Sequence, residues 1–192
     1  MIKITLASGS PRRKELLASL GVDFEVRTKP IDESVGDAQP PHEAAQYLAR
    51  LKAQAFEKDV QPHELIITAD TVVIHDHKIL GKPQNKAHAQ QMLLALSGNT
   101  HEVVTGVCIY YQHKYEVFAE TTQVVFKSLT TQEVNYYIEH YQPFDKAGAY
   151  GIQEWIGMVG IERIEGDYYN VVGLPLQKVY TRLKAIAPEI WG

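Results

Sequence analysis

The sequence predicts an α/β protein built around a mixed β-sheet. Apolar strand-like runs are followed in several places by amphipathic helical segments, which is typical of βα units. Two long β-prone segments, residues 102–111 and 115–127, are joined through Gln112-His113 and predict an antiparallel hairpin. Because βα units do not alternate strictly, the pattern favours a mixed sheet over a doubly wound parallel one. The length of 192 residues predicts one domain, residues 1–192, with two lobes.

The first half of the chain begins with a short buried strand over residues 2–7. Ser10 is a favoured N-cap and Pro11 suits the first helical position, so a helix is expected from there to about residue 20, where Gly21 ends it. A strand over 24–28 and a polar loop over 30–41 follow. A helix is expected over 41–58, with one apolar face made of Ala44, Tyr47, Leu48, Leu51 and Ala55. The next elements are a central strand over 65–74, a turn at His75-Asp76-His77 and a return strand over 78–80.

The second half of the chain is expected to contain the hairpin and three further helices. A helix begins after Asn85 and ends at about residue 96, because Gly98 is a typical residue just past a helix end. Thr130 and Glu133 form a capping-box pattern that predicts a helix to about residue 140. The remaining predicted elements are a Gly-rich loop over 143–160, a strand over 159–164, a turn at 166–167 and a last helix after Pro175.

Composition excludes several classes of protein. The formal charge is −4, which argues against extended binding to a nucleic-acid backbone. No apolar run approaches the roughly 18 residues that a membrane span needs, and the first residues do not resemble a signal peptide. The single cysteine, Cys108, allows no internal disulfide and no cysteine-based zinc site. We therefore expect a cytoplasmic protein without stable nucleic-acid binding or membrane binding, and this composition leaves room for a small phosphorylated ligand.

Two arginines stand in an unfavourable place. Arg12 and Arg13 fall in the first turn of a predicted helix, where the helix dipole disfavours cations unless an anion lies beside them. The preceding Ser8-Gly9-Ser10 offers hydroxyls, small side chains and free backbone N–H groups to such an anion. The alternative is a solvated arginine pair beside an ordinary Ser-Pro cap.

A second anomaly is Asp70, which interrupts an apolar β-run. A buried carboxylate is costly unless it is paired, hydrogen-bonded or metal-bound. Asp70 is therefore either a structural acid near the end of a strand or an acid that binds a cation or accepts a proton from water. Further candidates are Lys52, Lys82 in a Gly-Lys-Pro turn, and Glu33 in an acidic loop. The alternative for Lys52 is a lysine that only extends along the apolar helix face, and the alternative for Glu33 is a solvated surface residue.

Other motifs carry less information. Neither HExxH nor GxSxG occurs, and the Gly-Lys-Pro segment lacks the glycine spacing of a Walker A loop. His75 and His77 are interpreted as exposed turn residues, not as metal ligands. The tyrosines in the last third of the sequence suit packing better than base stacking: Tyr136, Tyr137, Tyr141, Tyr168 and Tyr169.

An ordered set of short motifs resembles the Maf family of nucleoside triphosphate pyrophosphatases. The matching stretches are residues 6–13 (LASGSPRR), Glu33, Lys52, 69–73 (ADTVV), 81–83 (GKP), 96–98 (LSG), His101, 105–106 (TG), 145–153 (DKAGAYGIQ) and 169–175 (YNVVGLP). Each stretch is weak alone, but the ordered set spans almost the whole chain. Residues 154–156 (EWI) depart from the smaller, Gly-rich sequence expected there.

The resemblance implies a long twisted mixed sheet flanked by helices around a central cleft, as in inosine triphosphate pyrophosphatases. It also implies a homodimer, a divalent metal (Mg²⁺ or Mn²⁺), and cleavage of the α–β phosphoanhydride bond to give a nucleoside monophosphate and pyrophosphate. Arg12, Thr71 and Gln153 resemble the residues that mark the dTTP/UTP branch of the family.

Chemical roles follow as hypotheses. Arg13, Lys52 and Lys82 would stabilise negative charge on the triphosphate, and Ser8 and Ser10 would hold phosphate oxygens. Glu33 and Asp70 would hold the metal, and Asp70 would also accept the proton of the attacking water.

Base selection is expected to depend on Gln153, with Arg12 and Thr71 nearby. A glutamine amide can meet one carbonyl and the imide N–H of thymine or uracil.

Two alternatives remain at this point. One is a nucleotide-binding regulator of cell division and septum formation in which catalysis is not essential. The other is a house-cleaning enzyme that acts on modified pyrimidine triphosphates. The carboxylates Glu33 and Asp70 favour hydrolysis over simple binding, because carboxylates beside a phosphate site repel the ligand.

Overall fold

Strand β3 (Glu64–His75) organises the sheet. A computed structural model describes residues 2–33 and 39–191, and within them seven strands form one sheet in the order β2-β1-β3-β5-β6-β7, with β4 paired to β3. β1 (Lys3–Leu6) pairs in parallel with both β2 (Phe24–Val26) and β3. β4 (Lys78–Leu80) is antiparallel to β3, and β7 (Ile161–Glu165) is antiparallel to β6. The predicted mixed α/β sheet is therefore confirmed.

Two tight hairpins use the same backbone conformation. The turn between β3 and β4 has positive φ at Asp76 and His77 (48° and 61°). The turn between β5 (Thr100–Tyr111) and β6 (Lys114–Phe126) has it at Gln112 and His113 (47° and 61°). Positive φ at both central residues matches the right-handed twist of the flanking strands. Both predicted turns are confirmed, except that His75 is the last residue of β3 with a side chain only 13% exposed.

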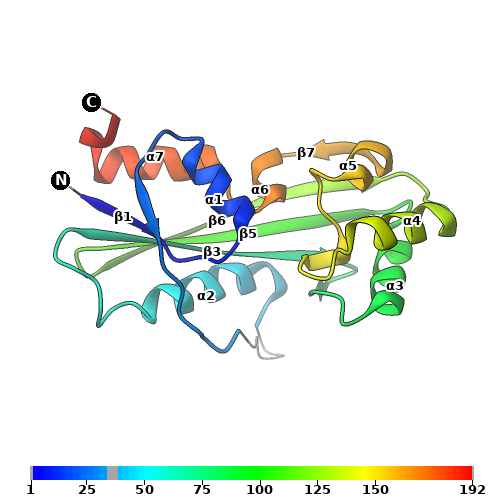
Figure 1. The fold of residues 1–192 in the computed structure, drawn as a ribbon, viewed down its shortest axis with the longest axis horizontal. Helices are drawn as coiled ribbons and strands as arrows, with labels where there is room; N and C mark the ends of the chain where they lie inside the picture. The colour runs from blue at the N-terminus through cyan, green and yellow to red at the C-terminus, as the bar shows by residue number, and fades with distance from the viewer. Residues whose placement is uncertain (1, 34–38, 192) are drawn as a thin grey trace. The chain divides into compact units, whose positions relative to one another are not determined.

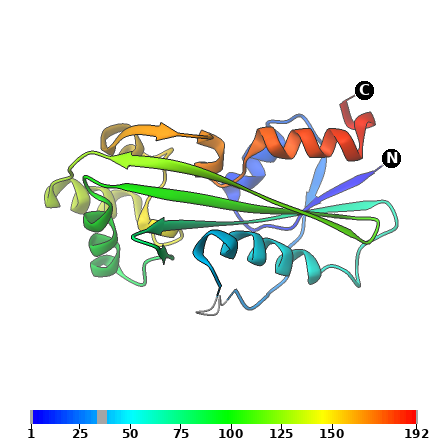
Figure 2. The same cartoon turned by 180° about the vertical axis from the view of Figure 1, so that it is seen from behind.

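The chain divides into two compact units. The first comprises residues up to 70, 105–120 and those from 173 onward, and the second comprises 71–104 and 121–172. In the first unit, α2 (Pro41–Gln54) lies on one side of the strands, with α1 (Pro11–Ala18) and α7 (Leu176–Ile186) on the other (Figures 1 and 2). The second unit contains the helices α3 (Lys86–Leu96), α4 (Thr131–Tyr141), α5 (Trp155–Gly160) and α6 (Tyr168–Val172). No helix in the described ranges is long and apolar enough to span a bilayer.

The predicted buried face of helix α2 is partly confirmed, at Ala44 and Leu48, and wrong at Tyr47. Its buried residues are Ala44, Ala45, Leu48, Ala49 and Ala53, whereas Tyr47 is 45% exposed. A Cβ atom placed on Gly106 of β5 would lie 2.3 Å from the carbonyl of Ala45, so only glycine allows this approach. The close approach selects small side chains at the contact, so the large Tyr47 side chain lies outside it.

The predicted loop over 143–160 is partly wrong. It contains a 3₁₀ turn, η1 (Ala147–Ala149), and the helix α5. Gly148 has φ of 68° and packs against Val73, where an added Cβ would lie 3.0 Å from a side-chain methyl. Its backbone N–H donates to the carbonyl of Gly81 at 3.1 Å. These tertiary contacts order a segment whose glycines predict a loop.

The boundaries of other elements also differ from the predictions. The capping box at Thr130 is present with both of its hydrogen bonds. Helix α2 ends at Gln54 and not near residue 58, β7 begins at Ile161, and neither α6 nor η2 (Pro188–Trp191) was predicted. Residues 34–38 of the predicted polar loop lie outside the described residues.

His101 lies in a buried aromatic cluster of the second unit. It is 2% exposed, its ring contacts those of Phe126 and Tyr150, and its Nε2 is 2.7 Å from the hydroxyl of Tyr150. Burial, with a smaller contribution from His75, lowers the pKa of His101 to about 3. The folded protein therefore holds this imidazole neutral well below the pH at which an exposed histidine gains a proton.

This burial predicts a pH-dependent loss of stability. The unfolded chain binds a proton at His101 near pH 6.5 and the folded chain does not, so the free energy of unfolding should fall from about pH 7 downward toward pH 3. At pH 5 the loss amounts to about 2 kcal/mol. Urea denaturation at pH 7 and pH 5 should show that His101→Gln reduces this pH-dependent difference by about that amount. His63→Gln, at an exposed histidine, should leave it unchanged, and an equal difference in both variants would contradict the assignment.

Candidate functional site

The segment between β1 and α1 forms a cluster of hydroxyl groups at a helix start. Ser10 is the N-cap of α1, and its Oγ accepts a hydrogen bond from the backbone N–H of Arg13 at 3.4 Å. The Oγ of Ser8, a residue only 9% exposed, accepts one from the N–H of Ser10 at 3.3 Å. Backbone N–H groups at a helix start and neighbouring hydroxyls suit phosphate oxygens.

The Arg13 guanidinium is held on two sides. Its Nε donates to the carbonyl of Gly173 at 2.9 Å, and its Nη1 donates to Oγ of Ser8 at 3.4 Å. Burial lowers the pKa of Arg13, opposed by the nearby carboxylates of Asp70 and Glu33. An arginine remains charged in proteins, so the site keeps a fixed cation there. The sequence analysis did not predict that Gly173 accepts this hydrogen bond. Every residue has a backbone carbonyl, so the residue type does not indicate which carbonyl will bind an arginine.

Lys52 connects the two predicted carboxylates. Its Nζ lies 2.5 Å from Oδ1 of Asp70 and 3.1 Å from Oε1 of Glu33. These two oxygens therefore lie no more than 5.6 Å apart, the sum of the two distances. The side chains of Lys52 and Asp70 are 16% and 13% exposed, and that of Glu33 is 52% exposed. Three residues from distant parts of the sequence thus share one solvent-reachable cluster.

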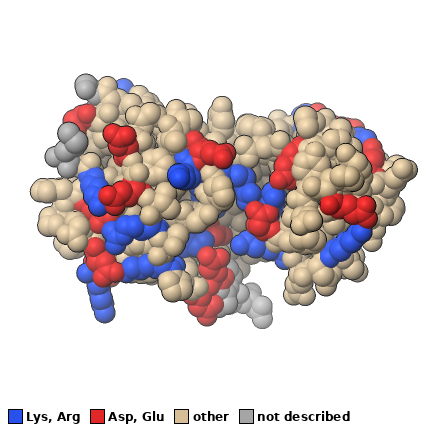
Figure 3. All heavy atoms as spheres, in the orientation of Figure 1, with Lys and Arg blue, Asp and Glu red and all other residues tan. Residues whose placement is uncertain are grey.

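The packing of α2 places Lys52 in this cluster. The hydroxyl of Thr68 on β3 donates to the carbonyl of Ala49 at 2.6 Å, which fixes the helix against the strand two residues before Asp70. Asp70 and the following Thr71 are the two partly exposed residues in the middle of β3, between the buried Ala69 and Val72. Basic and acidic side chains are intermingled over the face shown in Figure 3.

The carboxylate pair fits a hard divalent cation. Within 2–33 and 39–191, no three His, Cys, Asp or Glu side chains form a group that could hold a metal ion by themselves. Mg²⁺ commonly binds through one or two carboxylates and takes its other ligands from water and substrate phosphates. The spacing of Glu33 and Asp70 suits this mode, provided that the Lys52 ammonium yields one of its contacts.

The other predicted residues belong to the second unit, apart from the half-buried Arg12 on α1. Thr71 follows Asp70 directly on β3 and is half-buried, whereas Lys82 and Gln153 are exposed. Of the five tyrosines considered for base stacking, Tyr137 is fully buried. The other four are at least 36% exposed: Tyr136, Tyr141, Tyr168 and Tyr169. Cys108 is a buried free cysteine whose pKa is raised by burial to about 12, which leaves it an unreactive thiol.

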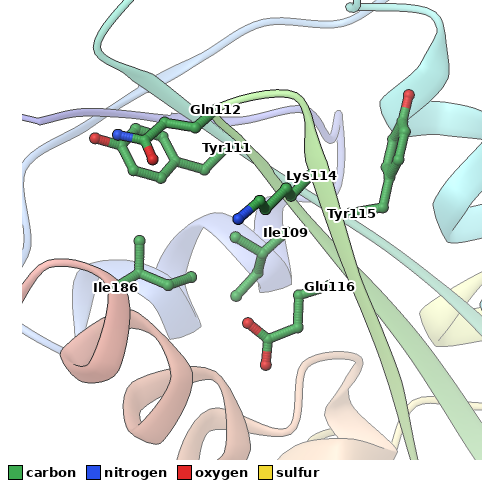
Figure 4. Close-up of a pocket in the computed structure, with 7 residues that line it drawn as sticks. All are labelled: Ile109, Tyr111, Gln112, Lys114, Tyr115, Glu116 and Ile186. Carbon is green, nitrogen blue, oxygen red and sulfur yellow. The ribbon is translucent and has the colours of Figure 1, made fainter.

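A separate hollow of about 390 Å³ lies in the first unit near the β5–β6 turn (Figure 4). Ile186 of α7 faces Ile109 of β5 across it. The hollow is lined by Ile109, Tyr111, Gln112, Lys114, Tyr115, Glu116 and Ile186. None of these is a predicted site residue.

Comparison with known proteins identifies the family. The sequence pattern described as Maf-like protein matches residues 3–186. The chain belongs to the Maf family. Relatives from Bacteroides fragilis and Phocaeicola vulgatus, both named dTTP/UTP pyrophosphatase, are 52% and 51% identical over 185 residues, with 96% of each chain covered. A relative of the same name from Flavobacterium psychrophilum is 50% identical, with 94% of this chain and 93% of its own covered.

The similarity to solved structures is lower. A nucleoside-triphosphatase (dITP/XTP pyrophosphatase) from Mycobacterium abscessus aligns with 98% of this Maf-family chain and 96% of its own. The TM-score is 0.46 and the sequence identity is 12%. A similarity this low supports no conclusion about the site.

The shared lysine predicts strong coupling between Lys52 and Asp70. Lys52→Met should lower the free energy of unfolding by about 1–3 kcal/mol, because two carboxylates then lose their counter-charge. Adding Asp70→Asn should recover part of that loss, which a double-mutant cycle in urea denaturation measures. Lys86→Met removes a surface pair with Glu139, both side chains being more than half exposed, and should cost at most about 0.5 kcal/mol. Simple additivity of Lys52→Met and Asp70→Asn would contradict the coupling.

Proposed function

We propose that this Maf-family protein hydrolyses dTTP and UTP to the nucleoside monophosphate and pyrophosphate. The observation that carries the proposal is the cluster of Lys52, Asp70 and Glu33, together with Arg13, whose pKa responds to both carboxylates. The names of relatives at about 50% identity over nearly the full length support the substrate assignment.

The reaction we propose is a direct displacement by water. The water oxygen forms a bond to the α-phosphorus, the bond from that phosphorus to the bridging oxygen breaks, and pyrophosphate leaves. Asp70 accepts the proton of the attacking water, and an ionised carboxylate has lone pairs for this while one oxygen contacts Lys52. No covalent enzyme intermediate is required.

Charge stabilisation would come mainly from positioned cations. Arg13, held by Gly173 and Ser8, would contact phosphate oxygens, and the Ser8 and Ser10 hydroxyls with the first N–H groups of α1 would orient them. Lys52 would hold the Asp70 carboxylate in place through their contact and would add positive charge beside the triphosphate. Lys82 would add a further cation. Glu33 and Asp70 would hold Mg²⁺ or Mn²⁺, which neutralises part of the triphosphate charge.

Base recognition is assigned to Gln153, with Arg12 and Thr71. Thymine and uracil present an imide N–H beside a carbonyl, and a glutamine amide offers the complementary acceptor and donor. Cytosine has an acceptor in place of the N–H, so its binding would leave a polar group unpaired. A homodimer and a cytoplasmic location stay predictions, and light scattering of the purified chain tests the first.

The catalytic proposal predicts a large effect of Asp70→Asn. Pyrophosphate release from dTTP with Mg²⁺ should fall by at least about 100-fold, because the general base and a metal-binding carboxylate are both lost. Chelation with EDTA should abolish wild-type activity, and added Mg²⁺ or Mn²⁺ should restore it. Asp59→Asn, which alters another lysine-paired carboxylate of the same unit, should stay within about twofold of wild type.

Four results would overturn parts of this proposal. An active Asp70→Asn enzyme would exclude the assigned role of Asp70. Release of inorganic phosphate in place of pyrophosphate would exclude cleavage at the α–β bond. Nucleotide binding without any turnover would favour the regulatory alternative, whereas faster turnover of modified pyrimidine triphosphates would favour the house-cleaning one.

The specificity proposal predicts a selective loss in Gln153→Ala. The ratio of kcat/KM for dTTP to that for dCTP should fall by about 10- to 100-fold, the effect of losing one or two hydrogen bonds to the base. Gln123→Ala, at an exposed glutamine of β6, should leave the ratio unchanged. An unchanged ratio in Gln153→Ala would remove this residue from base recognition.

A further inference from the structure

A hydrogen-bond network surrounds the segment that carries Gln153. Tyr137 on α4 is fully buried, and its hydroxyl has two partners. It donates to Oε2 of Glu154 and accepts from the backbone N–H of Gly151 at 2.9 Å. One buried phenol thus contacts both ends of the four-residue segment 151–154.

The network continues to Lys146. Its Nζ lies 3.1 Å from Oε1 of Glu154, and its side chain is only 10% exposed. The backbone N–H of Glu154 donates to the carbonyl of Gly151 at 3.0 Å, which closes the segment into a turn. A Cβ on Gly151 would lie 2.9 Å from Cδ of Glu154 and 3.1 Å from Cε of Lys146, so the side chains pack directly on the backbone.

Gln153 lies inside this turn and takes no part in the network. Its side chain is exposed, while the preceding Ile152 is only 7% exposed and anchors the turn to the core. Among the described residues, the contacts therefore hold the backbone of the turn and leave the Gln153 amide open to a ligand.

We propose that Tyr137, Lys146 and Glu154 are positioning residues for base recognition, because their network fixes the turn from which Gln153 meets the pyrimidine. This inference rests on the proposed function of Gln153. None of the three residues contacts substrate in this account. They act by limiting the positions that the Gln153 backbone can adopt.

The physical basis is the cost of breaking a buried network. A tyrosine hydroxyl buried without partners is unfavourable, and here both its donor and its acceptor capacity are used. Burial, then the hydrogen bond to Glu154, raises the pKa of Tyr137, so the phenol remains a donor. Displacement of a recognition group by about 1 Å can cost about 100-fold in rate. A rigid turn would therefore keep the Gln153 amide in the position that distinguishes one base from another.

The test compares kcat and KM for dTTP and dCTP in a set of variants. Tyr137→Phe removes the hydroxyl and should lower the dTTP to dCTP ratio of kcat/KM about tenfold, mainly through a higher KM for dTTP. Because Tyr137 is fully buried, its substitution could disturb the fold. Glu154→Ala is therefore a second variant, at a residue whose side chain is partly exposed. Glu154→Gln keeps an acceptor for the hydroxyl and should retain most of the ratio. Tyr141→Phe, at the 36% exposed tyrosine stacked on Tyr137, is the matched control and should not change it.

The same variants in a Gln153→Ala background separate positioning from general damage to the fold. If the network acts through Gln153, Tyr137→Phe should change the ratio less than about twofold once the amide is absent. An equal effect in both backgrounds would overturn the inference. So would a normal ratio in both Tyr137→Phe and Glu154→Ala while Gln153→Ala is impaired, which would leave the proposed function intact. A normal ratio in Gln153→Ala would overturn the role of Gln153 itself, and the positioning inference with it.

Discussion

The candidate site depends on one ammonium group that lies between two carboxylates. Lys52 contacts Asp70 and Glu33, and without it the partly buried Asp70 would lose the cation in direct contact with it. The position of that ammonium depends in turn on the close packing of α2 on β3 and β5, where Gly106 admits the backbone of Ala45. A stripe of alanines and one glycine thus determine the geometry of a charged cluster.

In the proposed function, the same arrangement would let carboxylates and a triphosphate share one site. Carboxylates repel phosphates, so Asp70 and Glu33 are compatible with the substrate only when cations separate them from it. Lys52 and Arg13 supply fixed positive charge, and a hard divalent ion would add to it. A protein that only bound nucleotides would gain nothing from these carboxylates unless they held a metal for binding alone, so they favour the proposed hydrolysis over passive binding.

Two glycines of the second unit allow close packing of neighbouring groups. Gly148 and Gly151 occur in a segment that reads as a loop, yet each allows side chains or backbone to approach closely. Glu154 departs from the small residues expected at its position, and its carboxylate is a partner of both Tyr137 and Lys146. The departure therefore has a local explanation, because the larger side chain ties α4 to the turn that carries Gln153.

Local rules determined much of this protein from its sequence. Caps at Ser10 and Thr130, two-residue turns and the interrupted apolar run at Asp70 each depend on neighbouring residues, and all appear in the structure. The motif order identified the Maf family for the same reason, since short stretches carry it. Tertiary structure alone decided which face of α2 is buried, why residues 147–149 and 155–160 are helical, and that Lys52 joins Glu33 to Asp70. These features arise from contacts between distant residues, whose shapes and charges no local pattern specifies.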